Sequence, residues 1–370
     1  MADKDDDAVD LGANPPHDPD ATPRLGKKVE DATGNYALTR ETVKAAQDTN
    51  TGGIVLSKKH PPSDDKPEDY PNEDHWTAIN TTIPENQNPE VLLDRVIRYV
   101  ERYNHARVDG TTVATAAIVD EKVYTSNLGD ATVIAFIHNP NLDDPNPDNH
   151  DKIKAIQITR NHVVSDQQER DDMPDKSKLI TLGGHHRYKN KDETGNTNLS
   201  RTIGDSNYDL IRIPENRSLD LKSYLDQGMN IYVVAGSDGI MERTTLEDME
   251  QLVRKTIKTA RKSTGQMPSL KEIAIHLIEW RHKNGKIEHY TCNDDATVVV
   301  QEVKREPASS QQFGKKNVKL ITIADGHGYN PDHGYDSILA DIVAGEVPLF
   351  FEHPNLMHDA VMSRDKTNKT

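Results

Sequence analysis

The sequence predicts an α+β fold in which sheets and helices form separate layers. Short apolar runs of strand length follow one another between residues 113 and 158, and two amphipathic helical patterns follow one another between residues 246 and 284. Strands that are grouped apart from paired helices are typical of an α+β or layered sheet–helix domain. No repeat of fixed period is visible along the chain.

The first helix is expected over residues 88–106. Asn88 can serve as its N-cap, Pro89 occupies the first helical position, and Glu90 follows in the first turn. One apolar stripe runs along this segment, formed by Leu92, Leu93, Val96, Ile97, Val100 and Tyr103. The stripe indicates a helix that buries one face.

The later elements follow from the same kinds of pattern. Strands are expected at residues 113–119, 122–126, 132–137, 155–158, 231–235, 296–303 and 318–324. Helices are expected at about 246–262, from Ser269 to near Asn284, and at about 335–345. Ser269 and Glu272 have the spacing of a capping box, which marks the start of the second of these helices.

Composition divides the chain near residue 76. Residues 1–75 are rich in Asp, Pro, Asn, Lys and Thr, and such a stretch buries too little apolar surface to offset its ordering entropy. We expect a mostly disordered acidic lead at 1–31, a single domain at 32–360 that contains a polar loop at 58–75, and a tail at 361–370.

Charge and cysteine content exclude several classes of protein. The chain has 45 Lys and Arg against 61 Asp and Glu, a net charge of −16, which argues against sequence-independent binding of nucleic acid. The single cysteine, Cys292, excludes a disulfide scaffold and a cysteine zinc site. No apolar run predicts a membrane helix or a classical secretory signal. We therefore expect no membrane partner, and a location in the cytoplasm or delivery to a host cell without a classical signal peptide. Nothing such as a heptad pattern suggests assembly, so we expect a monomer.

Four aspartates share one kind of position, at the end of an apolar strand and beside small or polar residues. They are Asp130, Asp238, Asp294 and Asp325. Hard cations such as Mg²⁺ and Mn²⁺ prefer oxygen ligands, and rigid strand ends hold carboxylates with little spread in position. A single Asp-Gly pair is more often turn chemistry. The recurrence of the pattern, extended once to Asp325-Gly-His-Gly328, favours a metal site.

His327 follows the metal-type aspartate by two positions. A lone histidine is usually structural or exposed, but beside such an aspartate it could act as a general acid, because its pKa lies near neutrality. An unrelated metallohydrolase is a further alternative, built around His327, Asp332, His333 and Asp336. Their spacing fits no metal-ligand pattern that we can justify.

At this point the sequence resembles the metal-dependent serine/threonine protein phosphatases of the 2C type. The segment Asp325-Gly-His-Gly328 is similar to the DGHG motif of that family. Six further segments resemble family motifs in the family's own order: Gly110-Thr-Thr-Val-Ala-Thr-Ala117, Tyr124-Thr-Ser-Asn-Leu-Gly-Asp130, Ile158-Thr-Arg-Asn-His162 with Glu169-Arg170, Asn198-Leu-Ser-Arg-Thr-Ile-Gly-Asp205, Ala235-Gly-Ser-Asp-Gly239 and Asp294-Asp-Ala-Thr-Val-Val-Val300.

The resemblance implies a fold, a reaction and a set of site residues. The fold would be a four-layer α-β-β-α sandwich of two antiparallel sheets flanked by helix pairs. The reaction would be hydrolysis of phosphoserine or phosphothreonine in a phosphorylated protein substrate, by water that two Mg²⁺ or Mn²⁺ ions activate. Asp325 and the carbonyl of Gly326 would bind metal together with Asp238 and Asp294, Asp130 would hold a third, weaker ion, and His327 would be the general acid.

The same resemblance implies supporting roles for other segments. Arg201 and Asp205 belong to a motif that we interpret as structural support for the sheet. Residues 185–197 fall where the family carries a variable flap, and their basic side chains could help to meet a phosphorylated substrate.

Two departures from the family pattern stand out. The DGHG strand, which lies before the Gly110 strand in the family, here follows the last strand of the domain. The sequence therefore indicates a circular permutation, or a catalytic domain closed by its own C-terminal segment. The family's early arginine and acidic element has no clear counterpart; we favour Asp48 over Glu30 and Asp31 for its acidic residue. The missing arginine leaves a catalytically inactive, phosphatase-like binding or regulatory module as the alternative function.

Overall fold

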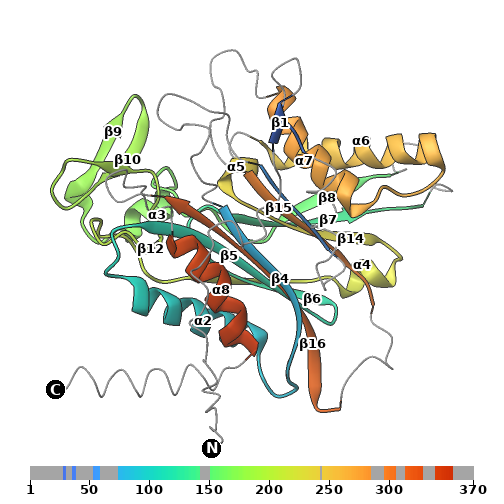
Figure 1. The fold of residues 1–370 in the computed structure, drawn as a ribbon, viewed down its shortest axis with the longest axis horizontal. Coiled ribbons are helices and arrows are strands. Elements are labelled where there is room, and N and C mark those ends of the chain that lie inside the picture. Colours follow the sequence, from blue (N-terminus) through green and yellow to red (C-terminus); the bar gives the residue numbers. More distant parts are fainter. Residues whose placement is uncertain are drawn as a thin grey trace, which may run out of the picture.

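The computed structural model describes residues 28–30, 36–38, 53–58, 74–141, 151–241, 244–284, 296–305, 313–327 and 338–352. Two antiparallel sheets form the centre of the molecule, and helices lie on their outer faces (Figure 1). Among the described residues, no helix is both long and apolar enough to cross a membrane.

The larger sheet has the strand order β13-β6-β5-β16-β4, with the short β12 pairing beside β5. Its strands are β4 (Asp74–Pro84), β5 (Gly110–Val119), β6 (Lys122–Leu128), β12 (Ile203–Gly204), β13 (Glu215–Asp220) and β16 (Lys315–His327). Strand β16, the last strand among the described residues, is thus inserted between β4 and β5 and pairs antiparallel with both.

The smaller sheet has the order β3-β15-β14-β7-β8. Its strands are β3 (Ile54–Lys58), β7 (Thr132–His138), β8 (Ile153–Gln157), β14 (Asn230–Gly236) and β15 (Ala296–Val303). Strands β7 and β14 are buried along almost their whole length, so they form the centre of this sheet. Their near-continuous apolar sequence is typical of strands covered on both faces.

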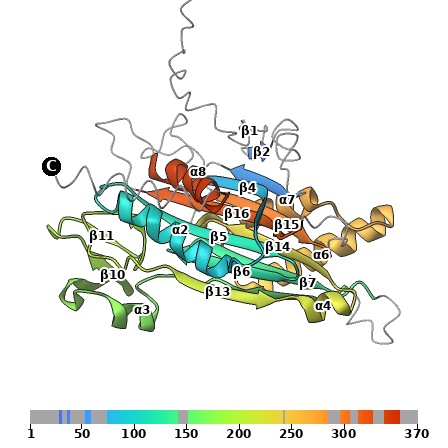
Figure 2. The same cartoon turned by 90° about the horizontal axis from the view of Figure 1, so that it is seen from below.

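Helices α2 (Pro89–Asn104) and α8 (Ile338–Glu352) pack on the outer face of the larger sheet (Figure 2). They also contact each other, and the rings of Tyr99 and Phe350 lie with their centroids 4.4 Å apart. The helix that follows β16 in the sequence therefore packs beside α2.

Strand β16 buries both of its faces, and its residues alternate between them. Leu320 and Ala324 pack with α2 and α8, whereas Ile321 and Ile323 face the core shared with the smaller sheet. This alternation follows from the period of two of a β-strand. Helices α6 (Leu246–Thr264) and α7 (Leu270–Asn284) add their apolar faces to the shared core.

The remaining elements are short. They are β1 (Lys28–Glu30), β2 (Tyr36–Leu38), α3 (Gln167–Asp172), the 3-10 turn η2 (Lys176–Lys178), β9 (Leu179–Leu182), β10 (His185–Lys189), β11 (Asn196–Thr197), α4 (Lys222–Asp226) and α5 (Asp238–Met241). Strands β9 to β11 form a small separate sheet. Strands β10 and β11 lie in the segment 185–197, which we expected to be a flap, and β9 precedes that segment.

The two helix starts that we predicted from capping residues are confirmed. The Asn88 side chain accepts from the backbone N–H of Glu90 at 3.0 Å, and Ser269 and Glu272 exchange the two bonds of a capping box. The polar loop expected at 58–75 included residues that belong to strands at both of its ends, because Lys58 ends β3 and Asp74 begins β4. The last helix, expected at about 335–345, is described from Ile338 to Glu352, and residues 335–337 lie outside the described residues.

Candidate metal centre

Asp325 lies near the end of β16, directly opposite Asp74 of β4 on one side and Thr112 of β5 on the other. Its backbone carbonyl accepts a hydrogen bond of 2.9 Å from the Thr111 hydroxyl. Asp325 is half-buried, whereas Asp74 is 6% exposed. Pairing in the sheet therefore sets two carboxylates side by side at one edge of the larger sheet.

Asp238 is linked to this pair by its neighbour Ser237. The Ser237 hydroxyl donates to a carboxylate oxygen of Asp74 at 2.8 Å and accepts from the backbone N–H of Thr297 at 3.0 Å. Ser237 directly follows β14, and Asp238 opens the short helix α5. The end of the smaller sheet thus meets the edge of the larger sheet where Asp325 lies.

Asp130 approaches the same region from the link between β6 and β7. The preceding residue, Gly129, packs so closely on Thr112 that a Cβ at Gly129 would lie 2.4 Å from the Thr112 Cβ. Thr112 is the residue opposite Asp325 in the sheet. Asp130 is 7% exposed, so this carboxylate too is largely removed from water.

These carboxylates fit a divalent cation. Like charges directly opposite each other on neighbouring strands destabilise a sheet. Asp74 and Asp325 stand in that arrangement. Oxygen donors from rigid strand ends are also what Mg²⁺ and Mn²⁺ prefer.

His327 continues β16 by two residues beyond Asp325 and lies opposite Gly110 of β5. Its ring nitrogen Nε2 is 2.6 Å from a carboxylate oxygen of Asp205. The imidazole remains 32% exposed, whereas the Asp205 side chain is 7% exposed. The buried carboxylate thus holds a histidine that keeps contact with solvent.

Several predicted site residues lie outside the described residues: Asp48, Asp31, Asp294 and the alternative cluster residues Asp332, His333 and Asp336. Glu30 is the last residue of β1. The strand that follows Asp294 begins at Ala296.

The sequence reasoning missed Asp74 as a member of this region. Asp74 is the first residue of β4 and directly follows Glu73 in the sequence. A pair of carboxylates at the start of a strand was the available signal. It was overlooked because β4 is an edge strand with polar residues and little alternation, so the segment did not resemble a strand by itself.

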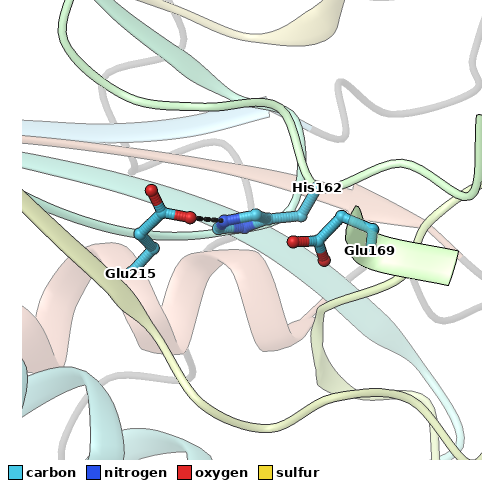
Figure 3. Close-up of side chains that lie close together, drawn as sticks. All are labelled: His162, Glu169 and Glu215. Carbon is cyan, nitrogen blue, oxygen red and sulfur yellow. Dashed lines mark hydrogen bonds and ion pairs between the residues drawn. The ribbon is translucent and has the colours of Figure 1, made fainter. Parts of the chain in front are cut away.

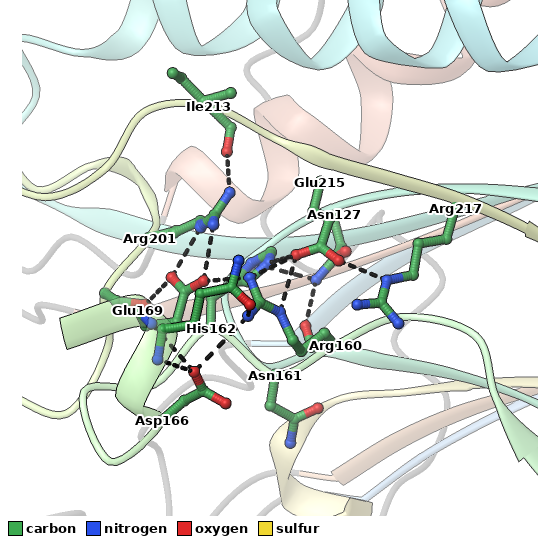
Figure 4. Close-up of polar contacts among 12 residues, drawn as sticks. Asn127, Arg160, Asn161, His162, Asp166, Glu169, Arg201, Ile213, Glu215 and Arg217 are labelled. Carbon is green, nitrogen blue, oxygen red and sulfur yellow. Dashed lines mark hydrogen bonds and ion pairs between the residues drawn. The ribbon is translucent and has the colours of Figure 1, made fainter. Parts of the chain in front are cut away.

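A second cluster of potential metal ligands is formed by His162, Glu169 and Glu215, whose ligand atoms all lie within 4.8 Å of one another (Figure 3). Its carboxylates are already neutralised by arginines. Arg201 donates to both oxygens of Glu169 at 2.9 and 2.7 Å, and Arg160 reaches Glu169 at 2.6 Å and Glu215 at 2.8 Å. We therefore interpret this cluster as an ion-pair network rather than a cation site (Figure 4).

The protonation of this network follows from its hydrogen bonds. The backbone N–H of Gly129 donates to Nδ1 of His162 at 3.2 Å, so the ring proton resides on Nε2 and is donated to Glu215 at 3.1 Å. Burial lowers the pKa of His162, which agrees with a neutral ring. The network thus supports Gly129, the residue before Asp130.

Glu101 of α2 lies behind the segment that carries Asp205. Its carboxylate accepts from the backbone N–H of Gly204 at 3.3 Å and lies 3.7 Å from Arg212. Burial raises the pKa of Glu101 to about 7, against the opposing effect of Arg212. Its ionised form is therefore a cost to the fold at neutral pH.

Replacing Glu101 with Gln is expected to remove a pH dependence of stability. Because the folded pKa is raised from 4.5 to about 7, the contribution of the protonated form is fully present below about pH 4.5 and lost as the pH rises through about 7. We expect Glu101→Gln to stabilise the protein by about 2–3 kcal/mol at pH 8 and much less at pH 5. Urea unfolding at both pH values measures this, and a difference independent of pH would contradict it.

Comparison with known proteins identifies one matching family. Residues 58–289 match the family model described as Protein phosphatase 2C, which is more than half of the chain. The match includes Asp74, Asp130 and Asp238 and ends before β16. The Probable protein phosphatase 2C 8 of Arabidopsis thaliana is 23% identical over 198 residues, which are 53% of this chain and 50% of that protein. The chain thus spans about half the length of that curated relative.

Two solved phosphatase structures that match this chain share little sequence with it. A serine-threonine phosphatase 2C from Toxoplasma gondii gives a TM-score of 0.44 at 13% identity and covers 68% of this chain and 95% of that chain. The catalytic domain of the serine threonine protein phosphatase PstP, solved in complex with 2 manganese ions, gives a TM-score of 0.36 at 13% identity. The match covers 68% of this chain and 98% of that chain.

Proposed function

The chain belongs to the protein phosphatase 2C family, and from this membership we propose that it hydrolyses phosphoserine and phosphothreonine in proteins with Mg²⁺ or Mn²⁺ as cofactor. The observation that supports the proposal best is the meeting of Asp325, Asp74 and the Ser237–Asp238 turn at one end of the sheets. A surplus of carboxylates at rigid strand ends is a ligand set for hard cations.

In this proposal Asp325, the carbonyl of Gly326, Asp238 and Asp294 hold two ions, and Asp130 holds a third. Asp74 takes the place that the sequence had assigned to Asp48. Bound ions of this kind supply Lewis acidity and lower the pKa of a water molecule.

The protein's own part in the chemical step falls to His327. As the oxygen of water bonds to phosphorus, the bond between phosphorus and the serine or threonine oxygen breaks. The leaving oxygen needs a proton, which protonated His327 would supply, and the proton that the attacking water loses would return to the histidine or to solvent. The products are inorganic phosphate and an unmodified hydroxyl side chain.

We further propose that the domain is the four-layer sandwich of its family, with one segment transposed along the chain. Strand β16 lies outside the matched span yet lies between β4 and β5, and its following helix packs with α2. In a simple circular permutation the family's early strands would also move behind β15. Strands β3 and β4 remain in front of α2, so transposition of β16 and α8 alone fits the order better.

The test is hydrolysis of a phosphothreonine peptide by the full chain, followed as release of inorganic phosphate. We expect turnover in millimolar Mn²⁺, and a decrease of at least roughly tenfold when EDTA is in excess, because carboxylate-held Mg²⁺ and Mn²⁺ exchange with solution. Asp238→Ala should be inactive in Mn²⁺. Full activity in excess EDTA would contradict the metal-dependent mechanism.

A catalytically inactive regulatory module is the second candidate, and one observation favours it. The residues that precede Asp74, from Lys66 to Glu73, include no arginine, although the family uses an arginine near this element to bind substrate phosphate. The two candidates differ in one result. An inactive module would bind the phosphothreonine peptide without releasing phosphate at any Mn²⁺ concentration.

A further inference from the structure

We propose that Asp205 is a positioning residue that fixes the orientation of the His327 imidazole for proton transfer; this inference rests on the proposed function. The contact joins residues 122 positions apart in the sequence, with Nε2 of His327 at 2.6 Å from Oδ2 of Asp205. An ionised carboxylate only accepts hydrogen bonds, so Nε2 carries the proton. As a general acid the ring must carry a second proton, on Nδ1. Nδ1 gives this proton to the leaving oxygen while Nε2–H stays on Asp205, in the manner of carboxylate–histidine pairs in hydrolases.

The backbone holds Asp205 in a conformation that is unusual for a residue with a side chain. Asp205 has φ of 50° and Gly204 has φ of 77°. The backbone N–H of Asp205 donates to the carbonyl of Asp109 at 3.1 Å, and the backbone carbonyl of Asp205 accepts from Arg212 at 3.0 Å. Such left-handed residues persist only where their surroundings fix them, and they are concentrated at functional sites.

Gly110 is the residue that allows the carboxylate and the imidazole to meet. It lies opposite Gly204 of β12 and opposite His327 of β16 in the sheet. A Cβ at Gly110 would lie 2.3 Å from the carboxyl carbon of Asp205 and 2.3 Å from Nε2 of His327. No real side chain tolerates such contacts, so the Asp205–His327 pair requires glycine at position 110.

The burial of the two partners favours positioning over a purely structural ion pair. The Asp205 side chain is 7% exposed and the His327 side chain 32% exposed. The carboxylate is therefore the fixed, internal member, and the imidazole is the member that solvent and substrate can reach. His327 also follows Asp325 and Gly326 directly along β16, so fixing its ring fixes it relative to the proposed metal ligands.

The test is a double-mutant cycle on phosphothreonine-peptide hydrolysis in Mn²⁺. We expect Asp205→Asn to lower kcat roughly tenfold with KM within about twofold, because a charge-assisted hydrogen bond is lost while the shape is kept. In a His327→Ala background the same substitution should have no further effect. Asp209→Asn is the matched control: this half-exposed aspartate in the same segment contacts Lys178 and Lys191, and its substitution should leave kcat unchanged.

A second measurement is independent of activity. In ¹⁵N-labelled, metal-free protein, the Nε2–H signal of His327 is identified by its loss in His327→Ala. We expect Asp205→Ala to shift that signal or remove it, with thermal unfolding confirming that the variant is folded. An unchanged signal, or a tenfold loss of kcat that persists in the His327→Ala background, would overturn the inference. If the wild-type chain releases no phosphate, the proposed function fails, and the NMR measurement alone decides whether Asp205 fixes the ring.

Discussion

Replacing Asp325 with Asn is expected to lower phosphatase activity by about 10³-fold, because an amide neither carries the negative charge nor binds a hard cation as a carboxylate does. The same change removes the opposition of like charges between Asp325 and Asp74. The metal-free variant should therefore be as stable as the wild type or slightly more stable. Phosphate release in Mn²⁺ and urea unfolding in EDTA measure the two effects.

Asp172→Asn provides the control for this prediction. Asp172 is an exposed aspartate at the end of α3, so the same chemical change there should leave both activity and stability within error. Activity of Asp325→Asn within a few-fold of wild type would contradict the assignment. A large loss of stability would mean instead that Asp325 is a structural residue.

The second large effect is expected for stability and concerns Arg201. Arg201→Met leaves the buried carboxylate of Glu169 without two of its hydrogen bonds, of 2.9 and 2.7 Å. Removing one partner of a buried ion pair typically costs about 3–5 kcal/mol. Urea unfolding at pH 7 should show a decrease of this order in the free energy of unfolding. The Arg217 side chain is 45% exposed, so Arg217→Met should cost less than about 1 kcal/mol.

The pH dependence of this network gives a further check. Burial raises the pKa of Glu169, but hydrogen bonds from Arg201 and Ser200 outweigh it and hold that pKa below the usual 4.5. The hydrogen bond from His162 likewise holds the pKa of Glu215 below its usual value. The stability from these carboxylates is present above about pH 4.5 and lost as the pH falls through their folded pKa values. The difference between wild type and Arg201→Met should therefore shrink in acid; a constant difference would contradict the account.

Much of the fold follows from local signals in the sequence. The run Val318–Ala324 indicates a buried strand by its apolar residues, and the Asn88 cap fixes the start of α2. These signals involve residues close together in the chain, where capping and periodicity decide the structure. The partner of a strand is a different matter, because pairing of β16 with β4 joins residues more than two hundred positions apart.

In the candidate site, too, some residues can be predicted from local sequence and others only from strand pairing. Asp325, Asp238 and Asp130 stand out because each follows an apolar strand beside glycine or another small or polar residue. Asp74 does not, because its strand is polar and takes its conformation from pairing with β16. The Asp205–His327 contact and the requirement for Gly110 likewise depend on three strands meeting in space. Spacing along one chain carries no signal for such contacts.

We propose that the metal centre lies where β16 and β14 end. Crystals of the full chain grown in Mn²⁺ test it directly by anomalous scattering. We predict two Mn²⁺ peaks about 3.5–4 Å apart beside Asp325 and Asp238. Anomalous density at His162, Glu169 and Glu215, with none beside Asp325, would contradict the account.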